Sequence, residues 1–283
     1  MGDILIAVMV LLAVLICILP IMHEIAISCS SNRAIISDKV VIFPVEFSWQ
    51  AYTSVLNDSS IIRSLFYTIG LTLVYTVFSM AMTICCAYPL TKKRLHGRSF
   101  FLTFIVITMY FSGGLIPSYL LVKMLGILDT SWALILPGMI SAFNVIILKT
   151  FFSSFPESLE EAAYLDGCTD IGILFKIVLP LSKPVLATLS LFYAVSRWSG
   201  FMDALMYITK PNLYPLPLKL YNIIYNSMSI NTIAQEGINV VQQPSADALK
   251  AATVMVATVP IILVYPWLQR YFVKGIMIGA IKG

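Results

Sequence analysis

The chain has 283 residues, of which 59% are hydrophobic and 11% are charged, and its formal net charge is +4. About one quarter of the residues in a soluble domain are charged, so this composition excludes an ordinary water-soluble protein. The five cysteines form no CxxC pair, and we expect neither a disulfide framework nor a metal site. The sequence predicts an all-α membrane protein that forms a single transmembrane domain over residues 1–283.

Apolar runs of suitable length predict six transmembrane helices, near residues 4–22, 64–90, 100–122, 131–152, 185–208 and 251–271. An even number of crossings puts both termini on one side of the membrane. The short connection 91–99 is dense in basic residues, which is typical of the cytoplasmic face. We therefore expect cytoplasmic termini, a cytoplasmic loop at 153–184, and external segments at 23–63 and 209–250.

Residues 155–180, FPESLEEAAYLDGCTDIGILFKIVLP, are unusual because they gather five carboxylates against a single lysine. Pro156 favours a first helical turn, and acidic residues are stabilised near the positive end of the helix dipole. Gly167 allows the left-handed turn that ends a helix. We predict a short helix over 157–165, a sharp turn, and an amphipathic helix that stops at Pro180. This layout is typical of a docking element for a cytoplasmic protein, or of a solvated loop with capping acids.

The spacing within this stretch closely resembles the EAA signature of permease subunits of ABC importers. The matching residues are Glu161, Ala162, Ala163, Asp166, Gly167, Ile177, Leu179 and Pro180. Cys168 stands where the signature usually has alanine. Further similar stretches are FSWQAY before the second predicted helix, Asn144 in the fourth, and the ending KGIMIGAIKG, which is similar to that of maltose-type carbohydrate permeases. The loop that begins at Pro244 looks closest to a branch associated with complex oligosaccharides.

The resemblance implies a permease of the bacterial cell membrane that imports a sugar and pairs with a second, homologous permease. Two cytoplasmic ATPase subunits would hydrolyse ATP, and an extracellular or periplasmic binding protein would deliver the sugar; no nucleic acid is expected as a partner. The chain has no Walker A loop, so ATP and Mg would be bound by the ATPases, and we expect no cofactor and no enzymatic activity here.

The resemblance also assigns roles to particular residues. The helix 157–165 would be the coupling helix, seated in an ATPase, with Glu161 facing an arginine of that partner. Residues expected to couple the chain to the ATPases are Glu160, Glu161, Ala162, Ala163, Asp166, Gly167, Leu179 and Pro180. Tail residues expected to reach the ATPase dimer are Gly279, Lys282 and Gly283.

Strongly polar residues within the predicted transmembrane helices are few, and Arg197 and Asp203 stand out. An arginine in mid-membrane costs about 2.5–3.5 kcal/mol on insertion scales, so it should face the bundle interior or water. Six residues of continuous helix separate two side chains by about 9 Å and 120°, so we expect each residue to have a partner on another helix. With Trp198 and Asn144 they are candidates for the translocation path. The alternative is a structural salt bridge between the two permeases, with Trp198 as an interfacial anchor.

Other functions stay open. A permease for a non-sugar solute would share the EAA signature. A proton-coupled secondary carrier would need several acids within its transmembrane helices, and only Asp203 lies clearly within one. A membrane-embedded enzyme would need convergent catalytic groups, whereas no histidine or cysteine pattern accompanies the acids of 153–184.

Overall fold

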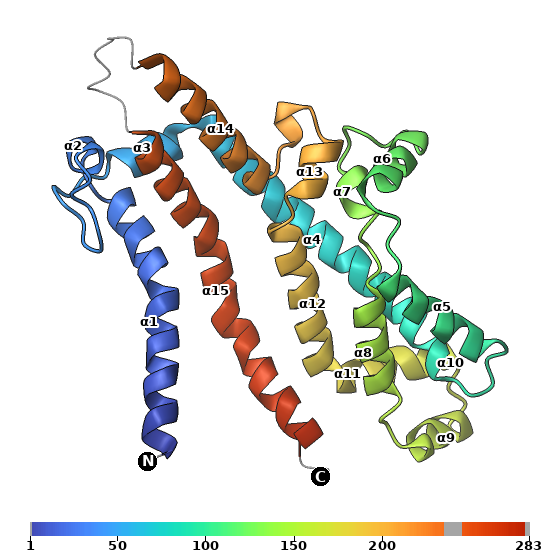
Figure 1. The fold of residues 1–283 in the computed structure, drawn as a ribbon. Coiled ribbons are helices and arrows are strands. Elements are labelled where there is room, and N and C mark those ends of the chain that lie inside the picture. The colour runs from blue at the N-terminus through green and yellow to red at the C-terminus, as the bar shows by residue number, and fades with distance from the viewer. Residues whose placement is uncertain (1, 235–244, 281–283) are drawn as a thin grey trace. The chain divides into compact units, whose positions relative to one another are not determined.

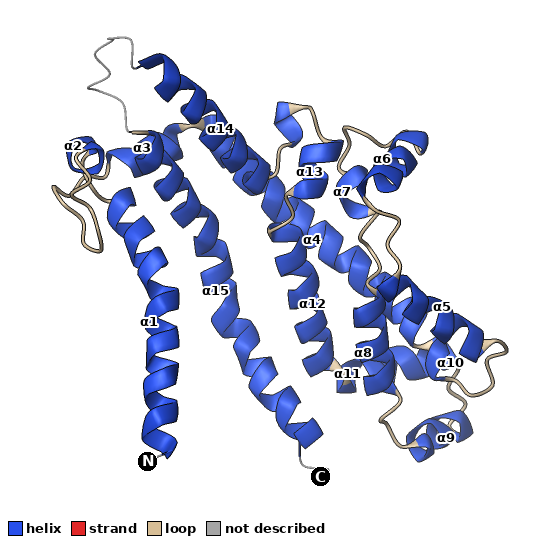
Figure 2. Ribbon diagram, viewed as in Figure 1, coloured by secondary structure: helices blue, strands red, loops and turns tan. Residues whose placement is uncertain are grey.

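A computed structural model describes residues 2–234 and 245–280. All regular structure in these residues is helical, as predicted (Figure 2). The chain divides into two compact units, Met1–Tyr67 with Tyr214–Ile262, and Thr68–Leu213 with Leu263–Gly283. The long helices α4 (Ser59–Ala87) and α15 (Ala246–Ala280) each contribute to both units.

The first unit also contains α1 (Gly2–Ser28), α2 (Asn32–Ile36), α3 (Gln50–Asn57) and α14 (Leu216–Ala234). A small apolar cluster of Ala26, Ala34 and Val40 is fully or almost fully buried. Polar contacts hold the segments around it: the hydroxyls of Ser28 and Tyr52 lie 2.9 Å apart, and the amide of Ser245 donates to Asn32 at 2.7 Å. The predicted external segment 23–63 thus contains α2, α3 and the adjoining ends of α1 and α4, with no helix over 37–49.

The second unit contains most of the shorter helices. They are η1 (Pro89–Thr91), α5 (Arg98–Tyr110), α6 (Leu115–Met124), α7 (Trp132–Ile135), α8 (Ala142–Phe152), α9 (Glu157–Leu165), α10 (Asp170–Ile173), η2 (Leu174–Val178), α11 (Leu179–Leu181), α12 (Lys183–Trp198), α13 (Met202–Tyr207) and η3 (Pro211–Leu213). Within this unit α8 packs beside α12, and α13 packs against α6 and α7 (Figure 1). Tyr193 of α12 links three helices of this unit. Its hydroxyl lies 2.7 Å from the hydroxyl of Thr83 on α4, and it accepts a hydrogen bond at 3.1 Å from the amide of Ser141, which precedes α8.

Three of the described helices are long and apolar enough to cross a membrane: Ile4–Ser28, Ser59–Thr91 and Ala246–Leu263. Two bent pairs raise the number to five if each pair is one crossing; α5 and α6 meet at 117°, and Asp170–Leu181 meets α12 at 82°. The prediction of several apolar transmembrane helices is confirmed. Six crossings and the side of the termini stay predictions.

Several predicted transmembrane helices are interrupted, and the local sequence explains the breaks. The segment 100–122 breaks before Gly114, whose φ of +85° is not helical. The segment 131–152 is divided around Pro137, which cannot donate a helical backbone hydrogen bond. The segment 185–208 is divided between Trp198 and Met202. These interruptions position the polar groups described next.

Candidate functional site

The helix α9 has the bounds predicted from the sequence, Glu157–Leu165. It ends in a Schellman turn: the amide of Gly167 donates to the carbonyl of Tyr164 at 3.0 Å, and that of Cys168 to the carbonyl of Ala163 at 2.9 Å. Gly167 has φ +79°, the left-handed conformation that the sequence predicted for it. The helix–turn–helix form of this loop is therefore confirmed.

The second helix of the loop differs from the prediction at its end. Thr169 caps α10 by accepting from the Gly172 amide at 3.2 Å. The chain then makes a π-helical turn, η2, and continues as α11 to Leu181. The helix runs one residue past Pro180, which was predicted to stop it, and ends at Leu181. The direction changes instead at Ser182, where α12 begins.

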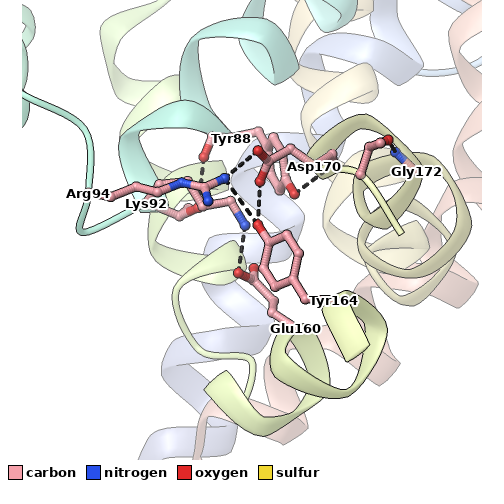
Figure 3. A network of polar contacts seen from close by, with 9 residues as sticks. Tyr88, Lys92, Arg94, Glu160, Tyr164, Asp170 and Gly172 are labelled. Carbon is pink, nitrogen blue, oxygen red and sulfur yellow. Dashed lines mark hydrogen bonds and ion pairs between the residues drawn. The ribbon is translucent and has the colours of Figure 1, made fainter. Parts of the chain in front are cut away.

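Three of the five carboxylates in this loop form ion pairs with the basic segment that follows α4, and Figure 3 shows two of these pairs, Lys92–Glu160 and Arg94–Asp170. The Lys92 ammonium lies 2.6 Å from a carboxylate oxygen of Glu160. The other two pairs are Lys93–Glu157 and Arg94–Asp170. Exposure differs sharply: the side chains are 12% and 30% exposed in the Lys92 pair but 77% and 70% exposed in the Lys93 pair. The sequence interpretation missed these contacts, since it took the basic segment only as a sign of membrane orientation.

Two tyrosines complete this network (Figure 3). The Tyr88 hydroxyl donates to the carbonyl of Asp170 at 3.0 Å, and the Lys92 ammonium lies 4.4 Å from the centre of the Tyr88 ring. The Tyr164 hydroxyl donates to the carboxylate of Asp170 and accepts from Arg94 at 3.2 Å. The hydrogen bond to Asp170 raises the pKa of Tyr164. Although burial disfavours the charged form of Lys92, the contacts with Glu160 and Tyr88 outweigh it and raise the pKa of Lys92. Both groups therefore hold their protons at neutral pH.

The remaining two acids of the loop are free to meet another molecule. Glu161 and Asp166 are exposed, and neither forms an ion pair with any residue that the structure describes. Leu165, beside them at the end of α9, is 90% exposed. Ala163 is buried on the side of the helix away from Glu161 and Leu165, whereas Ala162 is exposed. The helix thus presents Glu161 and Leu165 outward, and Asp166 is exposed at its C-cap.

A second polar site lies where α12 gives way to α13. Arg197 is only 6% exposed and donates to both carboxylate oxygens of Asp203, at 2.5 and 3.0 Å, and to the carbonyl of Leu134 at 2.8 Å. Our expectation that each residue has its partner on another helix is wrong for this pair. The helix ends at Trp198 and a new one starts at Met202, so the angles of a continuous helix do not apply.

The neighbours of this pair include residues that sequence reasoning missed. A Cβ atom on Gly200 would lie 2.2 Å from the nearer guanidinium nitrogen, so only glycine leaves room for Arg197. The ring of Tyr75 lies 5.8 Å from the guanidinium carbon, and its hydroxyl donates to the carbonyl of Gly138 at 2.6 Å. The sequence did contain one signal of this crowding, because Gly200 directly follows Trp198 and Ser199 at the end of α12.

A cavity of about 340 Å³ opens beside the Arg197–Asp203 pair. Its lining includes both partners, Tyr75 and Gly200, but neither Asn144 nor Trp198. Asn144 is buried near the start of α8, and Trp198 is half-buried at the end of α12. Of the four predicted translocation-path residues, the structure brings only two together.

The other predicted site residues lie as follows. Leu179 and Pro180 form the first turn of α11, and Gly279 lies near the end of α15. Lys282 and Gly283 lie outside the described residues. Within the described part of the chain, no group of three or more histidine, cysteine, aspartate or glutamate side chains could hold a metal ion.

Comparison with known proteins identifies the family. Residues 97–278 match the family described as "binding-protein-dependent transport system inner membrane component". The chain is 43% identical to the polygalacturonan/rhamnogalacturonan transport system permease protein YtcP of Bacillus subtilis, over 99% of this chain and 98% of the relative. It is also 43% identical to protein LplC of the same organism, over 94% and 90% of the two chains.

A solved structure agrees with these relatives. The chain superposes with a TM-score of 0.86 and 32% identity on a chain from the crystal structure of a bacterial ABC transporter involved in import of the acidic polysaccharide alginate, with 96% of each chain covered. Both comparisons extend over nearly the whole chain, so the likeness is not confined to the EAA loop. The chain therefore belongs to the family of inner membrane components of binding-protein-dependent transport systems, and it is a multi-pass permease of the bacterial cell membrane rather than an enzyme.

Proposed function

We propose that the chain is one permease subunit of an ATP-driven importer for oligosaccharides that carry carboxylate groups. The observation that carries the proposal is the whole-length likeness to YtcP, which is named for the transport of polygalacturonan and rhamnogalacturonan. The alginate importer supports it, because alginate is also described as an acidic polysaccharide. In this arrangement the chain pairs with a homologous permease, two ATPase subunits and a solute-binding protein.

The α9 helix is the coupling helix in this proposal. Its exposed face carries Glu161 and Leu165, and Asp166 is exposed at its C-cap, which suits insertion into a cleft lined by basic and apolar groups of an ATPase. Gly167 sets the angle between α9 and α10, and α11, with Leu179 and Pro180, leads on to the transmembrane helix α12. Movement of the ATPases then shifts the loop as a rigid body, one of the common modes of switching. The tail residues Gly279, Lys282 and Gly283 contact the same ATPases.

The Arg197–Asp203 pair lies on the translocation path in this proposal, with Trp198 and Asn144 further along it. The adjoining cavity supports this role, since it places polar groups beside open space between helices. The bidentate pairing disfavours a proton-coupled carrier, because both carboxylate oxygens of Asp203 are already engaged by Arg197. Six crossings with cytoplasmic termini put α9 on the side of the ATPases.

The coupling role is tested with the variant Glu161→Ala in the complete transporter, reconstituted in proteoliposomes. We expect ATP-dependent uptake to fall by at least about tenfold, because a charged contact with the ATPase is lost. Glu157→Ala is the matched control, since Glu157 belongs to the most exposed ion pair of the same helix and should leave uptake nearly unchanged. Undiminished transport by Glu161→Ala, or uptake by the purified chain without an ATPase, would contradict the proposal.

The substrate is tested separately with the solute-binding protein purified alongside. We expect the proteoliposomes to take up oligogalacturonate but not a neutral maltooligosaccharide of the same length. Uptake of the neutral sugar alone would contradict the acidic substrate and leave the coupling role in place.

A further inference from the structure

We propose that Lys92 and Arg94, in the basic segment that follows α4 and η1, form a clamp that passes the movement of α9 to α4. These two cations are thus positioning residues for transport. This inference rests on the proposed function, in which α9 is moved by an ATPase. It adds a second mechanical connection to the one that runs along the chain from α10 to α12.

The clamp spans the sharp turn of the loop (Figure 3). Lys92 holds Glu160 on α9, before Gly167, whereas Arg94 holds Asp170 at the start of α10, after it. Tyr164 joins the two sides, because its hydroxyl contacts both Arg94 and Asp170. The basic segment therefore fixes both arms of the turn rather than one of them.

The basic side of the clamp is ordered by its own contacts. The amide of Lys92 donates to the carbonyl of Pro89 at 3.0 Å, and the Arg98 guanidinium donates to the carbonyl of Leu90 at 2.8 Å. The Tyr88 ring packs edge-on against Phe152 of α8, with ring centres 6.3 Å apart, and supports the Lys92 ammonium. A segment held in this way transmits a displacement, whereas a flexible loop would absorb it.

Apolar packing at α9 is limited. Ala163 is the one buried residue of this nine-residue helix, an alanine side chain buries little area, and the larger Leu159 and Tyr164 are each 38% exposed. The other connections of α9 are its short linker to α8 and the Gly167 turn. Charge-assisted contacts with the basic segment therefore add to the lateral hold on α9, and they lead through η1 into the 29-residue helix α4.

The clamp is tested by exchanging charges in the complete transporter. The variants are Lys92→Glu, Glu160→Lys, and the double variant that carries both changes and restores an ion pair of opposite polarity. Copurification of the ATPase, ATP hydrolysis, and uptake of oligogalacturonate are measured in proteoliposomes for each. We expect both single variants to retain the ATPase and its hydrolysis but to lose about tenfold in uptake, within the usual range of coupling between sites. The double variant should recover most of that uptake.

The neighbouring pair provides the matched control. Lys93→Glu and Glu157→Lys reverse the same kinds of charge on the same two segments, but both side chains are largely exposed. We expect these variants to transport like the unmodified protein.

Two results would overturn the clamp while leaving the proposed function intact: single variants at Lys92 and Glu160 that behave like the Lys93 control, or a double variant no better than the singles. An unmodified complex that brings down no ATPase would overturn the proposed function, and the clamp with it.

Discussion

Two ion-paired regions of this protein differ in burial and in the number of contacts that each charge makes. Arg197 is 6% exposed and its two terminal nitrogens donate to a bidentate carboxylate and a carbonyl, whereas the pairs beside α9 range from mostly buried to mostly exposed. Breaking a buried pair leaves a charge uncompensated, while an exposed pair contributes about 0–1 kcal/mol. The first region thus serves the integrity of the fold, and the second can be loosened or tightened without unfolding the protein.

The largest expected effect is that of Asp203→Ala. This change strands the buried Arg197 guanidinium, so we expect a loss of about 3 kcal/mol in stability, at the lower end for a buried pair because Asp203 is itself one-third exposed. The measurement is thermal unfolding of the purified complex in detergent. Arg197→Met with Asp203→Leu removes both charges and should lose less than the single change. If Asp203→Ala were as stable as the unmodified protein, the buried pair would contribute no more to stability than the exposed pairs beside α9.

A smaller effect is expected for Gly200→Ala. The added methyl group would overlap the guanidinium of Arg197, and relieving such an overlap costs about 2 kcal/mol. Gly70→Ala is the control, because a Cβ there meets no atom within 4 Å and alanine favours the helix α4. Unfolding temperatures of the two variants should move in opposite directions. Equal unfolding temperatures for the two variants would contradict this prediction, because they would mean that the Arg197 side chain moves aside at no cost.

On the α9 side, Gly167→Ala should cost about 1 kcal/mol, because φ +79° is unfavourable for any residue with a Cβ. There is open space around this position, so the effect is purely one of backbone conformation. Gly172→Ala, in the regular turn of α10, should not destabilise the loop, because alanine favours a helix. Limited proteolysis of the loop measures the difference, and equal cleavage rates would show that the turn does not depend on glycine.

The smallest effect concerns Asp129, which lies outside both regions. Hydrogen bonds from the amide and hydroxyl of Thr209 lower the pKa of this exposed carboxyl. A lowered pKa means that the contribution to stability is present above the ordinary value of 3.8 and is lost as the pH falls through the folded-state value. Asp129→Asn, which keeps the left-handed backbone accessible, should therefore be slightly less stable at pH 7 and indistinguishable in strong acid. Unfolding curves at several pH values measure this, and a gap that widens in acid would contradict the assignment.

Local signals explain which features the sequence predicted. The bounds of α9 and the turn at Gly167 follow from a proline, a crowded first turn of acids and a glycine, all within a dozen residues. The contact between Lys92 and Glu160 joins positions 68 residues apart, and no periodicity of either segment indicates it. The Arg197–Asp203 pair was missed for a different reason. The prediction assumed one continuous helix, but the helix ends at Trp198, so the direction of the Asp203 side chain relative to Arg197 does not follow helical geometry.

The π-helical turn at Leu174–Val178 has a consequence for how this loop can vary. A π turn closes its hydrogen bond five residues back instead of four, so it accommodates one residue more than an α turn. Removing one residue from this stretch would let the turn close as ordinary α-helix, leaving the flanking helices intact but rotating one about the other's axis. A deletion of a single residue would thus be absorbed at this point, and it would change the direction of α9 relative to α12.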